Sequence, residues 1–451
     1  PVYALTSNPL APMTLIALGG SLVVLLVGLS VHRLYGFGPA MLAAIMAGFA
    51  PNAIEHSRRI WGHDFIIFWA AVGLYALIRA MRTGHTRWYV LSMAAAVCAQ
   101  AGHLSGIFLW IPPLTVLFQV RPERWKRSLA WGLAIAVLVY LPWFLHDALT
   151  QDFADFKMML SLVTGQSGGS NRSTPVSAPL AWAGQLSDAF HIEMLGTAFQ
   201  DFIAADTVLA ILVPMWRLGI ALLVCAGMVC MVFRIKSSAH SHEQAFLLSM
   251  ILTALAPVAL FSLLPSTSVP SYQLPALTAQ LLALATLADM IQRRLHKPIR
   301  SVMICGLIAF QALAGLYYTA SLRGRLAEAE FGDGTVPTLA AERDAMRWII
   351  ERGGESDFCL MQNAWPPERR VEIWFGYLYY ALTGDNTLPT NRPGAERIFM
   401  IQSQEIQAAG LAKEILERNP PEPFGAIRVY EFSGPEARLW VQLTRRAAAK
   451  E

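Results

Sequence analysis

The sequence has few charged residues and few cysteines. Only 15% of its 451 residues are Asp, Glu, Lys or Arg, whereas 55% are hydrophobic, and this shortage of charge excludes a single soluble domain. The five cysteines are scattered without a CxxC pair, so neither a zinc site nor a disulfide framework is predicted. The sequence opens on Pro1 without a visible signal peptide, which favours a trimmed N-terminus. The composition predicts a polytopic membrane protein that carries a soluble part.

About ten stretches are apolar enough to be transmembrane helices, which need roughly 20 such residues. They cover residues 12–32, 37–53, 64–81, 87–102, 105–119, 128–146, 208–233, 245–264, 272–290 and 301–320. The fourth and fifth are short and meet at a turn, 102–106, that a glycine flanks on each side. This turn predicts a re-entrant point that lines a cavity. The alternative is one long helix with a glycine kink, which the Pro112–Pro113 pair disfavours.

The distribution of basic residues predicts the orientation, because cytoplasmic loops carry an excess of Lys and Arg. Alternate loops hold Arg82 and Arg87; Arg121, Arg124, Lys126 and Arg127; Arg234 and Lys236; and Arg293, Arg294, Lys297 and Arg300. The loops between them, which are 54–63, 102–106, 147–207 and 265–271, are expected on the external side together with both termini. Arg58 and Arg59 are the exception, since they form a basic pair on that external side.

The composition changes after Arg323, where the chain becomes charged and is broken by Gly and Pro. We expect a transmembrane domain over residues 1–323, with a long external loop at 147–207, and an extracytoplasmic α/β domain over 324–451. The pattern in the second domain predicts helices at 340–352 and 404–418. It predicts strands at 357–362, 397–402, 426–432 and 439–443.

Residues 55–64 are a charged turn between two apolar runs and contain two arginines, two histidines and an aspartate. Ionisable groups at the edge of a membrane are costly unless they face water or a partner, so this turn is a candidate functional site. The alternative is a solvated turn whose Arg and Trp side chains anchor the membrane interface. The outward position of Arg58 and Arg59 favours the functional interpretation, because an external pair of cations suits an anionic ligand.

Four stretches resemble motifs of the polytopic GT-C glycosyltransferases, in the bacterial branch related to protein mannosyltransferases and to the aminoarabinose transferase of lipid A. They are Pro1-Val-Tyr3, Ser57-Arg-Arg-Ile-Trp-Gly-His-Asp64, Trp88–Gly106 and Tyr272-Gln-Leu-Pro-Ala-Leu277. Each motif is short, and the resemblance rests on their order, their spacing and their common outward placement. It covers most of residues 1–320.

The resemblance implies an enzyme of the bacterial inner membrane with its active site on the periplasmic side. Such an enzyme moves a hexose or pentose, with inversion, from a polyprenyl-phosphate donor to a lipid, glycan or protein acceptor. Its partners are therefore this donor, the acceptor and the bilayer, and no nucleic acid. The family fold is an α-helical polytopic GT-C bundle, here with about ten transmembrane helices and the C-terminal α/β domain.

The resemblance also implies roles for individual residues. The candidate ligands of the donor phosphate are Arg58, Arg59, His63, His103 and Tyr272. Arginine suits this task because its planar guanidinium group binds phosphate oxygens in a bidentate manner. Asp64 matches the second outer carboxylate of the family and is the candidate for catalysis or metal binding, the proton acceptor for the attacking hydroxyl. No cofactor is implied with certainty, and a divalent metal ion stays open.

Three of these residues have a structural alternative. Asp64 could be the N-cap of the helix that follows it. His103 stands where the family usually has Lys or Arg, and it could be a cavity histidine bonded to the backbone. Tyr272 could belong to the belt of aromatic residues at the membrane interface. The main carboxylate of the family lies in a loop that would precede Pro1, so Asp64 would be one part of the site.

Two other functions are compatible with a chain of this composition. A transporter or flippase is disfavoured, because the hydropathy shows no internal repeat and the centres of the spans hold few ionisable groups. A catalytically inactive relative that binds a lipid-linked sugar stays possible, since the basic residues expected at 103 and before Tyr272 are replaced.

Overall fold

The computed structural model describes residues 10–50, 53–54, 65–150, 153, 186, 207–263, 274–327, 339–353, 358–362, 379, 383, 397–402, 411–424 and 427–448. The chain divides into two compact units. A helical unit spans 13–193 and 207–318, and a second unit contains the chain from residue 319 onward. The domain boundary expected at residues 323 and 324 stays a prediction.

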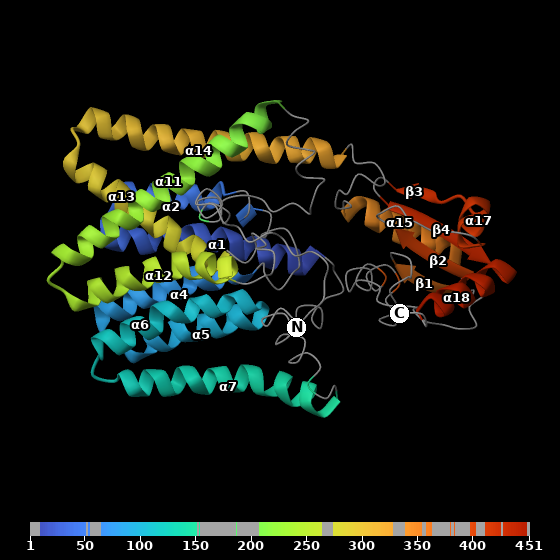
Figure 1. Cartoon of the computed structure of the whole chain (residues 1–451), viewed down its shortest axis with the longest axis horizontal. Coiled ribbons are helices and arrows are strands. Elements are labelled where there is room, and N and C mark those ends of the chain that lie inside the picture. The colour runs from blue at the N-terminus through green and yellow to red at the C-terminus, as the bar shows by residue number, and fades with distance from the viewer. Residues whose placement is uncertain are drawn as a thin grey trace. The chain divides into compact units, whose positions relative to one another are not determined.

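The helical unit is a bundle in which each of the ten expected apolar stretches is matched by helix (Figure 1). Its elements are α1 (Leu10–Tyr35), α2 (Phe37–Gly48), α4 (Ile66–Thr83), α5 (Thr86–Gly102), the 3₁₀ helix η3 (Leu104–Trp110), α6 (Ile111–Val120), α7 (Trp125–Thr150), α11 (Thr207–Ser237), α12 (Ser241–Leu263), α13 (Leu277–Arg294) and α14 (Lys297–Ala327).

Six helices of the described chain are long and apolar enough to cross a membrane. They cover Thr14–Tyr35, Ile66–Thr83, Ala210–Ser237, Ser241–Leu260, Leu274–Arg294 and Lys297–Tyr317. Helix α2 and the segment Leu104–Val120 are apolar but shorter. The structure therefore confirms a mostly helical, polytopic membrane fold, and six of its described helices are long enough to cross a membrane.

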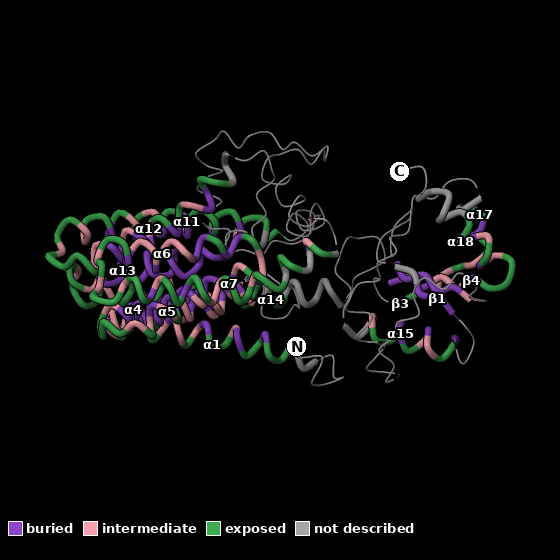
Figure 2. The backbone as a smooth tube through the Cα atoms, turned by 90° about the horizontal axis from the view of Figure 1, so that it is seen from below, coloured by how far each residue is buried: buried purple, intermediate pink, exposed green. Residues whose placement is uncertain are grey.

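Helix α13 forms the centre of the bundle, because 83% of its apolar window is buried, against 17% for the window of α14. Small residues allow its neighbours to come close, as is usual between membrane helices. Gly227 of α11 is an example, since a Cβ atom there would lie 2.2 Å from the carbonyl oxygen of Ala283. Figure 2 shows the buried residues gathered along the inner faces of these helices.

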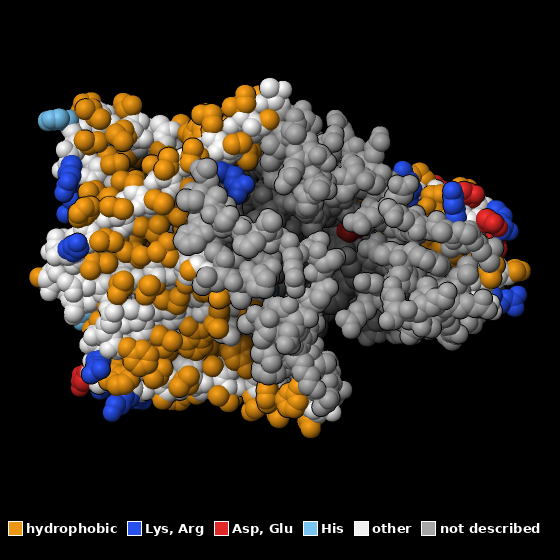
Figure 3. All heavy atoms as spheres, in the orientation of Figure 1, with side chains coloured by type: hydrophobic (Ala, Val, Ile, Leu, Met, Phe, Trp, Pro, Cys, Tyr) orange, Lys and Arg blue, Asp and Glu red, His pale blue; other side chains and the backbone are white. Residues whose placement is uncertain are grey.

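The outer surface of the bundle is apolar, and most of its basic residues gather at one end (Figure 3). An exception is Arg217, which is exposed in the first half of α11. Large side chains such as Leu138 (73% exposed) and Val302 (72% exposed) face outward, as lipid contact requires. The exposed basic residues of the described turns are Arg82, Arg87, Arg121, Arg124, Lys126, Arg127, Lys236, Arg293, Arg294 and Lys297. We call this end of the bundle the basic end. It contains the loops that the sequence assigned to one side of the membrane.

The second unit contains a four-stranded sheet in the order β1-β2-β4-β3. Its strands are β1 (Phe358–Gln362), β2 (Arg397–Gln402), β3 (Glu422–Phe424) and β4 (Ile427–Ser433). Strands β1 and β2 are parallel, with Leu360 opposite Phe399, whereas β4 runs antiparallel to both β2 and β3. The expected strands near 357–362, 397–402 and 426–432 are confirmed, and the short strand β3 was not expected.

Helices cover both faces of this sheet, because alternate residues of each strand point to opposite sides. Phe399 and Ile401 pack with Ile349 of α15 (Leu339–Gly353), which confirms the expected helix at 340–352. Ile398 and Met400 pack on the other face with helices α17 (Leu411–Arg418) and α18 (Gly434–Ala448). The helix expected at 404–418 is described over the range of α17.

The strand expected at 439–443 is wrong, since these residues belong to α18. Ala437 and Trp440 are both fully buried, and a spacing of three places them on one face of a helix, whereas a strand would turn them to opposite faces. Trp440 stacks on Phe432 of β4 with ring centroids 4.6 Å apart. Residues 439–443 form a helix because the helical face with Ala437 and Trp440 covers the apolar surface of the sheet.

Candidate functional site at the end of the bundle away from the basic end

Of the six candidate site residues, the structure describes His103. The other five lie outside the described residues: Arg58, Arg59, His63, Asp64 and Tyr272. Their roles stay predictions. What the structure provides is the turn that contains His103 and the helix ends that lead to the other five residues.

His103 lies between α5 and η3 in an extended conformation, with φ −165° and ψ 146°. Its ring nitrogen Nδ1 accepts a hydrogen bond from the backbone N–H of Ser105 at 3.2 Å and lies 2.9 Å from the Ser105 hydroxyl. The side chain therefore caps the first turn of η3, where backbone N–H groups have no partner within the helix. The structure thus shows a backbone hydrogen bond to His103, and its role as a phosphate ligand stays a prediction.

This cap restricts the protonation state of His103. A ring nitrogen that accepts a hydrogen bond carries no proton, so the cap requires a neutral imidazole with its proton on Nε2. A doubly protonated ring would have to give up the bond from the Ser105 amide, although Nδ1–H could still donate to the Ser105 hydroxyl. A neutral imidazole binds a phosphate more weakly than the Lys or Arg that the resemblance leads one to expect at this position.

The chain reverses direction at His103, and a glycine allows it. A Cβ atom on Gly106 would lie 2.4 Å from both the carbonyl carbon of Ala99 and the amide nitrogen of Gln100, so η3 packs directly on the backbone of α5. Trp110 Nε1 donates to the Gln100 side chain at 2.8 Å and closes the same contact. The turn expected at 102–106 is confirmed and the alternative of one kinked helix is wrong, but none of these five residues lines the cavity described below.

The helix ends around this turn belong to neighbouring elements. Helix α4 contacts both η3 and α13, and η3 contacts α12. The chain leaves α2 and enters α4 on either side of residues 55–64, and it enters α13 just after Tyr272, through a 3₁₀ turn at 274–276. Helix α4 follows the first of these segments and α13 follows the second, and these two helices contact each other.

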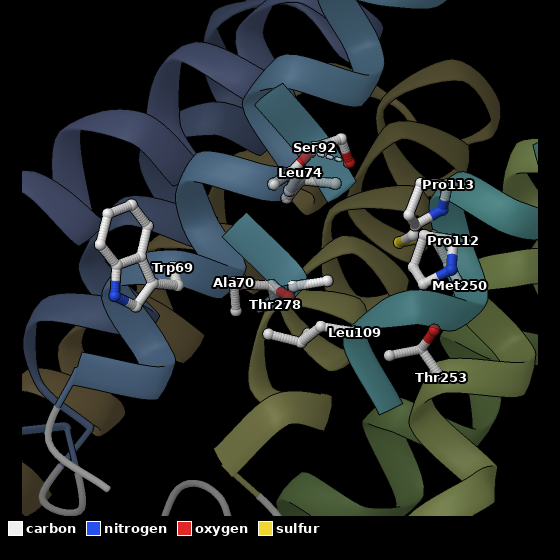
Figure 4. A pocket seen from close by; sticks show the side chains of 12 residues that line it. Trp69, Ala70, Leu74, Ser92, Leu109, Pro112, Pro113, Met250, Thr253 and Thr278 are labelled. Atoms are coloured by element: carbon white, nitrogen blue, oxygen red, sulfur yellow. Dashed lines mark hydrogen bonds between the residues drawn. The ribbon is translucent and has the colours of Figure 1, made fainter. Parts of the chain in front are cut away.

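A small cavity lies among these helices (Figure 4). It is lined by residues of α4, α5, η3, α6, α12 and α13: Trp69, Ala70, Gly73, Leu74, Ser92, Ala96, Leu109, Pro112, Pro113, Met250, Thr253 and Thr278. No charged side chain lines it. Ser92 donates to the Gly73 carbonyl at 3.0 Å and Thr253 to the Ser249 carbonyl at 2.8 Å, so these two hydroxyls are satisfied within the bundle. This lining has nothing with which to bind a phosphate.

Four charged side chains meet at the basic end, two of which, Arg234 and Arg293, the sequence analysis named only as loop cations. Arg234 of α11 donates to Glu243 of α12 at 2.5 Å and to Asp289 of α13 at 2.9 Å. Arg293 donates to the second oxygen of Asp289 at 3.1 Å. The Asp289 side chain is only 6% exposed, and a buried carboxylate requires such partners. We call these four residues the ion cluster.

Helix α1 joins the ion cluster through Tyr35. The Arg234 guanidinium group lies 4.8 Å from the centre of the Tyr35 ring, and the Thr286 hydroxyl donates to the Tyr35 oxygen at 2.9 Å. The cluster therefore ties α1, α11, α12 and α13 together at one end. The one signal for it in the sequence is the acidic Asp289 near the end of an apolar stretch.

The described residues contain no group of three or more His, Cys, Asp or Glu side chains that could hold a metal ion. Asp64 and His63 lie outside the described part of the chain. The divalent metal that the resemblance left open therefore stays untested.

The bundle together with the α/β unit defines a fold of the GT-C type. The solved structure of ArnT from Cupriavidus metallidurans bound to undecaprenyl phosphate is similar, with a TM-score of 0.55 and 14% identity over 94% of this chain and 84% of that chain. The apo structure of the same protein gives a TM-score of 0.54, with 14% identity over 95% and 84%. No family model and no curated protein matches the sequence. The resemblance stated from the sequence is confirmed at the level of the fold.

Proposed function

We propose that this chain is an integral-membrane glycosyltransferase that moves a sugar from a polyprenyl-phosphate donor to an acceptor on the external side of the membrane. The observation that carries the proposal is the fold, which matches over 94% of the chain a protein solved with undecaprenyl phosphate bound. The fold supports this class of activity, and the sugar and the acceptor are left to experiment.

The proposed chemistry assigns two tasks to residues 55–64. Arg58 and Arg59 bind the donor phosphate, for which the guanidinium group has a suitable geometry. An acceptor oxygen attacks the anomeric carbon, the bond from that carbon to the phosphate oxygen breaks, and the polyprenyl phosphate leaves with the bonding electrons. Asp64 accepts the proton of the attacking hydroxyl. The leaving group is already a phosphate, so the mechanism needs no general acid.

The described structure supports this assignment in two ways. Helix α4, which follows residues 55–64, contacts η3 and α13, and helix α12, which precedes Tyr272, also contacts η3. The re-entrant turn at His103 places irregular backbone within the bundle, which membrane proteins tolerate where the backbone is buried in protein or lines a water-filled cavity.

The test uses Asp64→Asn and Arg58→Ala in the full chain, purified and assayed with polyprenyl-phosphate sugars. We expect Asp64→Asn to insert normally into the membrane and to lose transfer, because an amide cannot accept the proton. We expect Arg58→Ala to weaken the binding of the donor more than the binding of the acceptor. Wild-type transfer by Asp64→Asn would refute the catalytic assignment. Donor binding without transfer in the unaltered chain would instead identify an inactive relative.

A further inference from the structure

Helix α2 is too short to cross a membrane. Its 12 residues extend about 18 Å, whereas the hydrocarbon layer is about 30 Å thick. A helix that starts at the basic end and stops after this length ends at membrane depth. The last carbonyl groups of a helix have no donor within it, and at this depth water does not supply one. The hydrogen-bond donors to the carbonyl groups at the C-terminal end of α2 therefore fix the position of that end.

Gln311 of α14 supplies one of these partners. Its Nε2 donates to the carbonyl oxygen of Phe49, the residue directly after α2, at 3.0 Å. Its Oε1 accepts from Trp216 Nε1 of α11 at 2.8 Å, and the Gln311 side chain is fully buried. Because each end of the amide has its own partner, the amide has one favoured orientation. Gln311 follows Lys297 by 14 residues, about 21 Å along α14, which agrees with the length of α2.

Gly315 lies one turn beyond Gln311 on the same face of α14. A Cβ atom at this position would lie 2.6 Å from the Phe49 oxygen, which is closer than real Cβ contacts allow. The Phe49 carbonyl therefore rests against α14, with Gly315 providing the space and Gln311 the hydrogen bond. Two residues of α14 and one of α11 thus fix the point at which the chain leaves α2.

We propose that Gln311 is a positioning residue that fixes the end of α2, six residues before the charged turn at 55–64, and thereby raises the affinity of that turn for the donor phosphate. The inference rests on the proposed function of the turn. Gln311 does not touch the phosphate; it acts through the backbone of Phe49. Loss of the amide would leave a buried acceptor without a partner and would free the start of the turn.

Gln280 of α13 provides a matched control. It is also a fully buried glutamine of the bundle, but neither atom of its amide has a hydrogen-bond partner in the part of the chain that the structure describes. The same substitution, Gln to Leu, therefore removes an amide with two partners at position 311 and an amide without partners at position 280. The two variants lose the same polar group, and they differ in whether α2 loses its contact.

The experiment measures two properties of the full chain in detergent micelles. The first is the Kd for undecaprenyl phosphate. The second is the rate at which a membrane-impermeant maleimide labels Ser57→Cys, corrected for the natural cysteines by using the chain without that change. We expect Gln311→Leu to raise the Kd for undecaprenyl phosphate about tenfold and to increase the labelling rate of Ser57→Cys severalfold. Gln280→Leu should change neither by more than about twofold, since no hydrogen bond is lost.

Two further variants keep the test informative if Gln311→Leu does not fold. Gly315→Ala displaces the Phe49 carbonyl while Gln311 is intact, and Trp216→Phe leaves the Gln311 oxygen without its donor. Both should change the labelling rate in the same direction as Gln311→Leu. Equal labelling and equal Kd in the Gln311 and Gln280 variants would overturn the positioning role. If the unaltered chain fails to bind undecaprenyl phosphate, the proposed function fails, and the labelling rates alone decide the positioning role.

Discussion

Neutralising Asp289 tests whether the ion cluster holds the bundle together. The Asp289→Asn change keeps the size of the side chain but removes the charge that faces Arg234 at 2.9 Å and Arg293 at 3.1 Å. Removal of one member of a buried ion pair costs about 3–5 kcal/mol, because the remaining charge stays desolvated without a partner. Arg234 is only 28% exposed, but it retains Glu243 at 2.5 Å. We therefore expect the low end of this range, about 3 kcal/mol.

The measurement is the free energy of unfolding in mixed detergent micelles, obtained by titration with a denaturing detergent. Arg293→Gln is the control, because the Arg293 side chain is 66% exposed and its pair with Asp289 connects one turn of the same helix. Such an exposed pair contributes between about 0 and 1 kcal/mol. If Asp289→Asn destabilised the protein no more than Arg293→Gln does, the cluster would not tie the helices together.

Substitutions at three other positions test the remaining contacts. His103→Ala should destabilise the re-entrant turn by about 1 kcal/mol, and His103→Asn, which can still cap η3, should recover most of the loss in thermal unfolding. Gly106→Ala should prevent a stable fold, seen as aggregation in size-exclusion chromatography, because the added carbon would meet the backbone of Ala99 at 2.4 Å. Trp440→Ala should cost the α/β unit about 3–5 kcal/mol by leaving a cavity beside Phe432, measured as a lower unfolding midpoint.

The features predicted correctly from the sequence are those with a local signal. The length of an apolar run determines whether a helix can lie in a membrane, so all ten apolar stretches were matched by helix. The apolar runs at 358–362 and 397–402 are too short for a membrane helix and were correctly predicted as the strands β1 and β2. Part of α18 was predicted as a strand because a short apolar run fits a strand or a helix equally well. The surface that the run covers decides between them. That surface is supplied by Phe432 and its neighbours on the sheet.

The contacts that the sequence did not predict join residues far apart in the chain. Arg234 and Asp289 are separated by 55 positions, and Gln311 and Phe49 by 262. Arg234 is one of several loop cations, and Gln311 lies in an apolar helix. The local sequence around neither residue predicts its partner. For His103 the sequence left two roles open; the structure shows the hydrogen bond from the Ser105 amide, and phosphate binding stays a prediction. The roles of Arg58, Arg59, His63, Asp64 and Tyr272 stay predictions.

The two ends of the bundle are built for different tasks. At the basic end, Arg234 and its partners tie four helices together, and the buried carboxylate of Asp289 is neutralised by two cations. At the other end, α2 stops short and the chain turns back at His103. The hydrogen bond from Gln311 holds the Phe49 carbonyl at the point where the chain leaves α2.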